Sequence, residues 1–438
     1  MGILRPMASG GLDVAGAATQ NRRARVAVAA LFLTNGAIFA NLLPRYPEIK
    51  ADLHLSNSVY GAAVAAFSGG ALVAGLAAAA LIRRFRSSRV AVLGTVGIAV
   101  FVFIAGLAPT SVILAAALFV AGACDAVTDV AQNAHGLRVQ RIYGRSIINS
   151  FHAVWSVGAI LGGLMGAGAI ALHIPRATHL AVAAAIFSAV ALVAYRYLLL
   201  GQDHDAHPSA RTAGELPGGG RAGLYTVLLA LVFLAIAGAV VEDAGSSWAT
   251  VYLDDSLRAP AAVAAFGYIA LVGFQFIGRL IGDRLVDRFG ESTVTRAGGF
   301  IAAAGMGAAL AFPRVPATIA GFAAAGFGVA TIVPAAMHGA DQLPGLRPVI
   351  GLTAVAWLMR LGFTLSPPIV GLIADATSLR VGLLGVPVAG LTVMALAGAL
   401  AKARPSTPNS VHGSDHLDGQ HPGHDEGDSE PHQPGERL

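Results

Sequence analysis

The strongest constraint on this chain is a series of about twelve apolar segments, each close to bilayer length. A helix needs roughly 20 apolar residues to cross about 30 Å of hydrocarbon. A water-soluble protein has no use for so many segments of this length, so the sequence predicts an all-α integral membrane protein. The expected helices span 26–44, 59–82, 90–108, 111–134, 148–172, 178–199, 223–242, 261–282, 295–312, 315–337, 349–374 and 380–402.

The composition also indicates a membrane protein, and it excludes several classes of function. The chain is 55% hydrophobic and 12% charged, whereas an average soluble domain is about 25% charged. Basic residues lie at segment ends, which is typical of anchoring at a membrane surface rather than of nucleic-acid binding. The lysines are Lys50 and Lys402, and neither follows a Gly-rich phosphate-binding loop. ATP is therefore not the expected energy source. No metal or other cofactor is expected either, since the helices carry no grouped His or Cys ligands.

The pattern also predicts the domain organisation and the topology. We expect a disordered N-terminus (1–25), a six-helix bundle (26–200), a cytoplasmic linker (201–222), a second six-helix bundle (223–402) and a disordered His- and acid-rich tail (403–438). Arginines gather in alternate loops, and the positive-inside rule then places both termini in the cytoplasm. The expected location is the bacterial cytoplasmic (inner) membrane.

Landmarks recur at nearly constant spacing between the two halves. His135 and His338 are 203 residues apart, Trp155 and Trp357 are 202 apart, and Arg84 and Arg288 are 204 apart. These offsets predict two parallel six-helix repeats, an arrangement that encloses a site between the halves.

This organisation resembles the major facilitator superfamily of secondary transporters. The most specific segment is Gly278–Gly290, which is similar to that superfamily's signature between the second and third helices of a half. The resemblance implies a conformational latch at the cytoplasmic mouth in the outward-open state, formed by Gly278, Gly282, Asp283, Arg284, Asp287 and Arg288. The first-half counterpart, Leu81–Arg89, lacks the acidic residue. The stretches Asp129–Gly136 and Glu242–Trp248 resemble an incompletely characterised bacterial branch related to fucose permease.

Ionisable residues inside the helices are the candidates for proton coupling. Asp125 and Asp129 are four residues apart and share one face of the fourth helix. A carboxyl group at membrane depth must face a cavity or a partner, and Asp125 lies closer to the midplane than Asp129. His152 can pass protons to Asp129, or it can be a hydrogen-bonded packing residue. Asp125 and Asp129 can also be structural carboxyl groups.

Arg360 is the most specific candidate for the substrate cavity, because its charge cannot be neutralised by losing a proton. Its anionic partner is either an internal carboxylate such as Asp125 or an acidic substrate. Trp155 and Trp357 are expected to occupy matching places in the two halves and can line the cavity or simply pack. Asn35, Asn41 and Gln275 can bind cargo or tie helices together. Glu242 and Asp243 are expected to cap the outer end of the seventh helix, and the alternative is a role in coupling.

These observations predict a secondary active transporter for a small organic solute that works by alternating access as a monomer. Proton coupling is the expected driving force, and the sequence leaves uptake of a sugar-like solute and efflux of a metabolite or drug both open. The alternatives are a membrane-embedded enzyme and a transport-inactive sensor or scaffold. The helices carry no recognised catalytic motif or grouped metal ligands, which argues against the enzyme.

Overall fold

The structure is a computed structural model that describes residues 10–144, 147–199, 220–343 and 350–403. Within these ranges, 12 spans are long and apolar enough to cross a membrane. The predicted all-α fold with twelve membrane helices is confirmed. The predicted tail and linker lie outside the described residues, except for Ala403 and for residues 220–222, which begin the helix Gly220–Val251.

The spans are built from continuous and broken helices. In chain order these are α1 (Gly10–Ala40), η1 (Leu43–Arg45), α2 (Tyr46–Asp52), α3 (Asn57–Gly75), α4 (Ala78–Phe85), α5 (Ser87–Gly106), α6 (Ser111–Tyr143), α7 (Ile148–Ala171), α8 (Arg176–Tyr195), α9 (Gly220–Val251), the π-helix η2 (Tyr252–Ser256), α10 (Ala261–Ala264), α11 (Phe266–Phe289), α12 (Glu291–Ala311), α13 (Val315–Val329), α14 (Ile332–Asp341), α15 (Ile350–Ala376), α16 (Leu379–Gly382), α17 (Gly385–Leu396) and α18 (Gly398–Lys402).

Local sequence explains several of the helix ends. The Ser56 and Thr110 hydroxyl oxygens accept hydrogen bonds from backbone N–H groups in the first turns of α3 and α6. Gly144 adopts a left-handed conformation (φ 64°) and ends α6.

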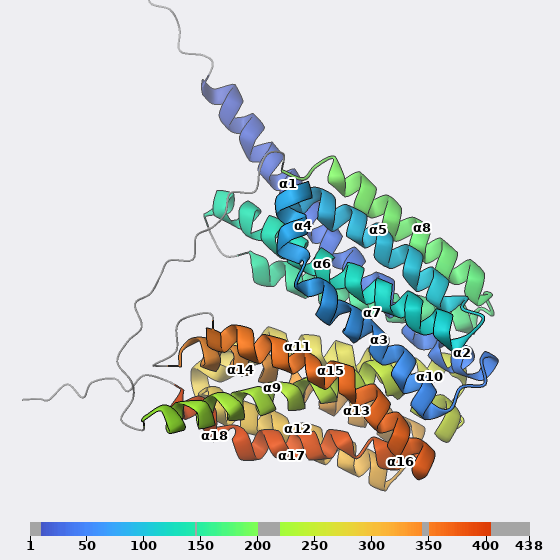
Figure 1. Ribbon diagram of the computed structural model, residues 1–438. Helices are drawn as coiled ribbons and strands as arrows, with labels where there is room; N and C mark the ends of the chain where they lie inside the picture. Colours follow the sequence, from blue (N-terminus) through green and yellow to red (C-terminus); the bar gives the residue numbers. More distant parts are fainter. Residues whose placement is uncertain (1–9, 145–146, 200–219, 344–349, 404–438) are drawn as a thin grey trace, which may run out of the picture. The chain divides into compact units, whose positions relative to one another are not determined.

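The helices form two groups, a first half from α1 to α8 and a second half from α9 to α18 (Figure 1). In the first half, α1 packs on α7 and α3 packs on α6. In the second half, the equivalent pairs are α9 with α15 and α11 with α13. The halves therefore repeat the same helix pairings.

Glycine contacts fix the repeat in residue detail. At Gly122 of α6, a β-carbon would collide with the backbone carbonyl of Phe67 in α3. Gly326 makes the same contact with Leu271. These two residues lie 204 positions after Gly122 and Phe67, respectively. Gly158 approaches the backbone of Leu33, and Gly362 approaches that of Ile236, at offsets of 204 and 203. These contacts support two parallel repeats, in which small residues let the helices approach closely.

The same register corrects the pairing of the two tryptophans. An offset of 204 places Met359, not Trp357, at the position equivalent to Trp155. Two residues along an α-helix correspond to a rotation of about 200°. The Trp357 side chain is 44% exposed, whereas Trp155 is only partly exposed and packs against the core. The two tryptophans are therefore not symmetric partners.

Two helix boundaries also differ from the sequence prediction. Residues 10–25, expected to be disordered, form the first turns of α1, where Ala and Arg favour a helix. The seventh helix, expected to end at residue 242, continues as α9 to Val251 and then as η2 to Ser256. Glu242 and Asp243 therefore do not cap a helix end. Asp243 lies about 20 Å before Ser256 along the helix, at 1.5 Å per residue.

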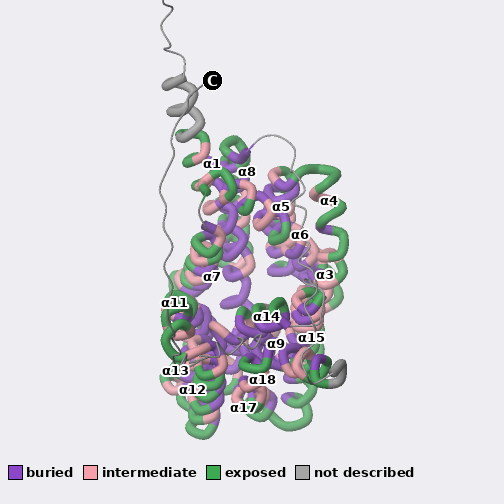
Figure 2. The backbone as a smooth tube through the Cα atoms, turned by 90° about the vertical axis from the view of Figure 1, so that its left-hand side faces the viewer, coloured by how far each residue is buried: buried purple, intermediate pink, exposed green. Residues whose placement is uncertain are grey.

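The outer surface of the helices is apolar. Leu76, Val112 and Phe312 are 76%, 74% and 71% exposed, and many other large apolar side chains are exposed along the spans. Figure 2 shows exposed residues distributed over the helices around a buried interior. Water would penalise this surface, whereas hydrocarbon accommodates it.

The halves are joined at one end of the helices. The Lys50 Nζ atom binds the Asp255 carboxylate at 2.7 Å, and the backbone N–H groups of Asn57 and Ser58 donate to Asp375 at 2.9 and 2.8 Å. We call the region defined by these five residues the closed end. At the opposite end, no hydrogen bond or ion pair links the halves within the described ranges.

Candidate functional site

A hydrogen-bonded network joins three helices of the first half around Asp125. Asn35 of α1 donates from Nδ2 to Asp125 Oδ1 of α6 at 3.0 Å. The indole N–H of Trp155 in α7 donates to Asn35 Oδ1 at 2.7 Å. The network holds the carboxyl group of Asp125 at a fixed position within the first half. Asn35 therefore contacts the predicted proton carrier directly, and Trp155 contacts Asn35.

A second polar chain begins one turn further along α6. Asn133 donates from Nδ2 to Asp129 Oδ1 at 2.9 Å, and a ring nitrogen of His152 lies 3.0 Å from Asn133 Oδ1. The His152 ring also meets the edge of Phe32, with the ring centres 5.2 Å apart. Asp129 and His152 are exposed although both lie within membrane spans. The Asn133 amide separates them, so any proton exchange between them needs water or a rearrangement.

Two arginines of the second half face these acidic and imidazole groups. Arg360 of α15 lies within electrostatic range of both Asp125 and Asp129. Arg279 of α11 lies within range of His152. None of the described residues forms a hydrogen bond or an ion pair with the Arg360 guanidinium. The first half thus presents carboxyl groups across the interface, and the second half presents a permanent positive charge that forms no ion pair with a described residue.

Two of the predicted cavity residues are tied to neighbouring helices. Asn41 is buried and donates to the Ala37 carbonyl at 2.8 Å, and its Oδ1 lies 2.9 Å from a ring nitrogen of His179 in α8. Gln275 is buried and donates to Glu242 of α9 at 2.9 Å. In this conformer these contacts occupy their amide groups.

The predicted latch residues have two different environments. Added β-carbons at Gly278 and Gly282 would lie 2.6 and 2.7 Å from side-chain carbons of Ala330 and Thr331, so this face of α11 packs closely. The charged members, Asp283, Arg284, Asp287 and Arg288, are exposed. None of these four forms an ion pair with another described residue. The ion pairs expected of a latch are therefore not formed among the described residues of this conformer.

Sequence reasoning missed the polar cluster around Asp243. The Asp243 side chain is 6% exposed and accepts a hydrogen bond from Ser247 at 2.9 Å. Tyr60 of α3 donates to the Ser247 carbonyl at 2.6 Å and packs against Trp248, with the ring centres 5.0 Å apart. The apolar run that continues after Asp243, through Trp248 and Val251, is the sequence signal that could have placed this carboxyl group inside the helix.

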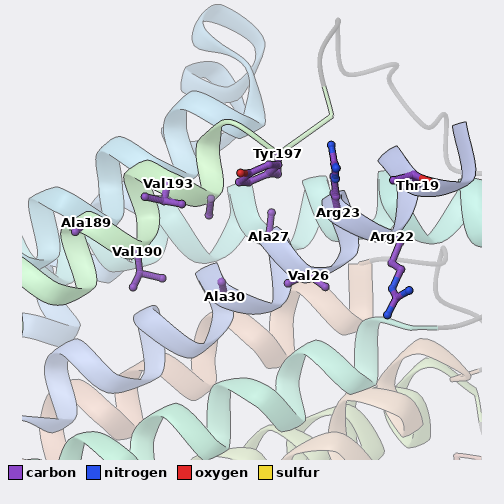
Figure 3. Close-up of a pocket in the computed structure, with 11 residues that line it drawn as sticks. Thr19, Arg22, Arg23, Val26, Ala27, Ala30, Ala189, Val190, Val193 and Tyr197 are labelled. Atoms are coloured by element: carbon purple, nitrogen blue, oxygen red, sulfur yellow. The ribbon is translucent and has the colours of Figure 1, made fainter. Parts of the chain in front are cut away.

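A separate pocket of about 800 Å³ lies between α1 and α8. Its wall is mainly apolar, and Arg22 and Arg23 contribute guanidinium groups (Figure 3). None of the candidate transport residues lines it.

Comparison with curated proteins supports a transport role. An uncharacterized transporter, y4wD of Sinorhizobium fredii, is 31% identical to the chain over 353 residues, covering 81% of the chain and 92% of that protein. The membrane protein MosC of Rhizobium meliloti is 27% identical over 369 residues, covering 84% of the chain and 88% of that protein. The chain therefore resembles these proteins along most of their length.

Solved structures show the same fold at low sequence identity. The inward-facing, unoccupied structure of a bacterial homologue of the human lysosomal transporter Spinster matches with a TM-score of 0.68 at 14% identity. It covers 88% of the chain and 99% of that structure. The D-xylose–proton symporter matches with a TM-score of 0.63, also at 14% identity, covering 88% of the chain and 98% of that structure.

The family model for the Major Facilitator Superfamily matches residues 28–342. This range extends from the first span through the tenth, and the relatives and the fold are those of transporters rather than of enzymes. The chain is a multi-pass membrane protein that belongs to the Major Facilitator Superfamily of transporters.

Proposed function

We propose that the protein is a proton-coupled secondary active transporter for an oxygen-rich organic solute. The observation that carries the proposal is the unpaired Arg360 guanidinium facing Asp125 and Asp129 from the other half. A permanent cation at this depth requires oxygen acceptors. A cargo bearing hydroxyl or carboxylate oxygens can supply them when it binds between the halves.

Asp125 is the proposed proton carrier. Burial makes the charged form of a carboxyl group costly, whereas a nearby cation favours it. The stabilisation that Arg360 gives to the charged form of Asp125 would therefore depend on the conformer. It would also depend on whether bound cargo screens the guanidinium. Loading or releasing a proton at Asp125 would in this way be linked to cargo binding, which is the requirement for coupled transport.

Alternating access follows from the two repeated halves. The closed end holds the halves together in this conformer, while the charged residues of the predicted latch form no ion pair with another described residue. We propose that both termini lie in the cytoplasm of a bacterial cell and that the closed end faces outward. The present conformer would then be inward-facing, and a single chain would suffice for transport.

A sugar-like or nucleoside-like cargo is compatible with this chemistry, since solved structures of similar fold include a D-xylose–proton symporter and a nucleoside transporter. A relation to the branch of fucose permease would fit the same class. Efflux uses the same site with the proton moving in the opposite sense. The relatives are transporters, which argues against the membrane-embedded enzyme and the transport-inactive sensor.

The experiment uses the full-length protein in liposomes. A thermal-stabilisation screen of sugars, nucleosides and small carboxylates first identifies a binding solute, and uptake of that solute is then measured with and without a pH gradient. We expect Asp125→Asn to abolish gradient-driven uptake while cargo still binds. The exposed Asp341 at the end of α14 provides the charge-matched control, Asp341→Asn. Undiminished driven uptake by Asp125→Asn would reject this carboxyl group as the coupling site.

Arg360→Ala separates the two roles of the arginine. If Arg360 binds cargo, the variant should lose stabilisation by the solute, and adding Asp125→Ala should not restore it. Recovery of cargo binding in the double variant would show that Arg360 serves to compensate Asp125. The sign of the pH change inside cargo-free liposomes on addition of solute separates proton symport from proton antiport.

A further inference from the structure

A second carboxyl group, distinct from Asp125 and Asp129, is buried near the closed end. Asp243 lies in α9, and its side chain is 6% exposed. One carboxyl oxygen accepts a hydrogen bond from the Ser247 hydroxyl at 2.9 Å. The other oxygen, Oδ2, is buried and has no hydrogen-bond partner. No basic side chain in the described part of the chain forms an ion pair with it.

An ionised carboxylate is expensive in this environment. Removing such a charge from water costs several kcal/mol or more unless a cation or several donors compensate it. Hydroxyl donors without a nearby cation do not provide that compensation. A neutral carboxylic acid avoids the charge, and its O–H group gives Oδ2 a donor that can bind a neighbouring oxygen.

Three hydroxyl groups lie near the carboxyl group. Ser366 of α15 is buried beside it, and the Ser366 hydroxyl has no other partner among the described residues. The Tyr46 phenol of α2 lies within electrostatic range, and its hydroxyl is also buried and unpartnered. Tyr60 of α3 is in range as well, but its hydroxyl already donates to Ser247. Groups from both halves therefore cover Asp243.

The remaining charged groups near this cluster are accounted for by other contacts. Glu242, next to Asp243 on α9, accepts a hydrogen bond from Gln275 of α11. Further toward the closed end, Lys50 pairs with Asp255 of η2. Asp375 of α15 accepts two backbone hydrogen bonds from α3. None of these groups provides a positive charge to Asp243 by direct contact.

We propose that Asp243 is a proton-binding site that controls the closed end. The proton resides on Oδ2 while Tyr46 and Tyr60 cover the carboxyl group, and it passes to water when the halves separate there. Deprotonation then opposes reclosure, because closing would bury an uncompensated negative charge. The inference rests on alternating access, but it is independent of the role given to Asp125.

The test measures access to the closed end as a function of pH. Cys124 is the chain's one cysteine, so a Cys124→Ala background permits a single reporter, Thr250→Cys. Thr250 is 3% exposed and lies seven residues after Asp243, on the same face of α9. The full-length protein in liposomes is treated with a membrane-impermeant maleimide over a range of pH.

The thiolate fraction of the reporter itself rises with pH, so each labelling rate is divided by the rate for Asp243→Asn, which keeps the group neutral, at the same pH. This ratio should rise with pH, by up to about tenfold per pH unit if one proton is released. The adjacent Glu242→Gln is the matched control and should keep the dependence of the parent. An unchanged pH profile in Asp243→Asn would overturn the proposal, as would labelling controlled by sodium at constant pH.

Infrared spectroscopy supplies a measurement that does not depend on the stability of the Asn variant. The parent protein should show the carbonyl stretch of a protonated carboxyl group, and Asp243→Glu should shift this band. A spectrum in which Asp243→Glu leaves all such bands unaltered would refute the assignment. Cargo uptake, measured in parallel, distinguishes a failure of this inference from a failure of the proposed transport function.

Discussion

Gly61 of α3 offers a direct test of how the halves close. A β-carbon added at Gly61 would collide with the backbone carbonyl oxygen of Pro367 in α15. It would also lie 2.8 Å from the carbonyl carbon of Pro367 and 3.1 Å from the α-carbon of Pro368. All three obstructing atoms belong to the backbone, so no side-chain rotation can relieve the collision. The contact joins the two halves, and it exists only while they meet at the closed end.

The size of the effect follows from this geometry. Overpacking a well-packed contact typically costs about 1–3 kcal/mol. In Gly61→Ala this cost applies to the conformer shown here and is absent once the halves separate. The equilibrium between the conformers should therefore shift by roughly 5- to 150-fold toward the one that is open at this end.

The assay is maleimide labelling of Thr250→Cys in the Cys124→Ala background, with the full-length protein in liposomes. Gly61→Ala should label faster by a factor in the range given above. Gly75→Ala, in the same helix, is the matched control, because no atom lies within 4 Å of its added β-carbon. A second comparison is Gly122→Ala, whose collision lies inside the first half and should lower thermal stability without favouring either conformer. Equal labelling rates for Gly61→Ala and Gly75→Ala would refute the reasoning.

Four other substitutions have defined outcomes. Asp375→Asn removes a charge that accepts bonds from the first N–H groups of α3, so closed-end labelling should rise about two- to fivefold at low salt and less at high salt. Arg86 has φ 75° and ψ 145°, so Arg86→Gly should raise the melting temperature in detergent, whereas Ala at the equivalent Gly290 (φ 80°) should lower it. If the latch stabilises the alternative conformer, Asp287→Asn should increase labelling of a cysteine placed at exposed Asn149; an unaltered rate would argue against the latch.

The sequence predicted the number of spans and the two repeats because both depend on local composition. Apolar segments of bilayer length are visible without knowledge of contacts, and a constant offset is visible without knowledge of packing. The end of α9 was not predictable in the same way. Glu242 and Asp243 interrupt an apolar run, and adjacent carboxyl groups usually mark a water-exposed end. The structure places them inside the helix, beside side chains from α11 and α15.

The candidate site was predicted residue by residue but not as a set of contacts. Asp125, Asn35 and Trp155 were each identified from their depth and residue type. Their mutual hydrogen bonds depend on the packing of α1, α6 and α7, which no local pattern specifies. The tryptophan pairing failed for a related reason. An offset that differs by two residues is small in the sequence but large on a helix surface, and only the Gly158 and Gly362 contacts reveal the register.

The glycine contacts inside each half determine where the molecule can deform. Gly122 and Gly326 bring helix backbones together with no side chain between them, so a sliding motion there has no rotamer change with which to adjust. Each half should consequently move as a rigid body. Strain that arises when cargo binds should then be transmitted undiminished to the surface between the halves. Substitutions that loosen the helix contacts at Gly122 or Gly326 would dissipate binding energy inside one half. Turnover would then be slower even where every cargo contact is intact.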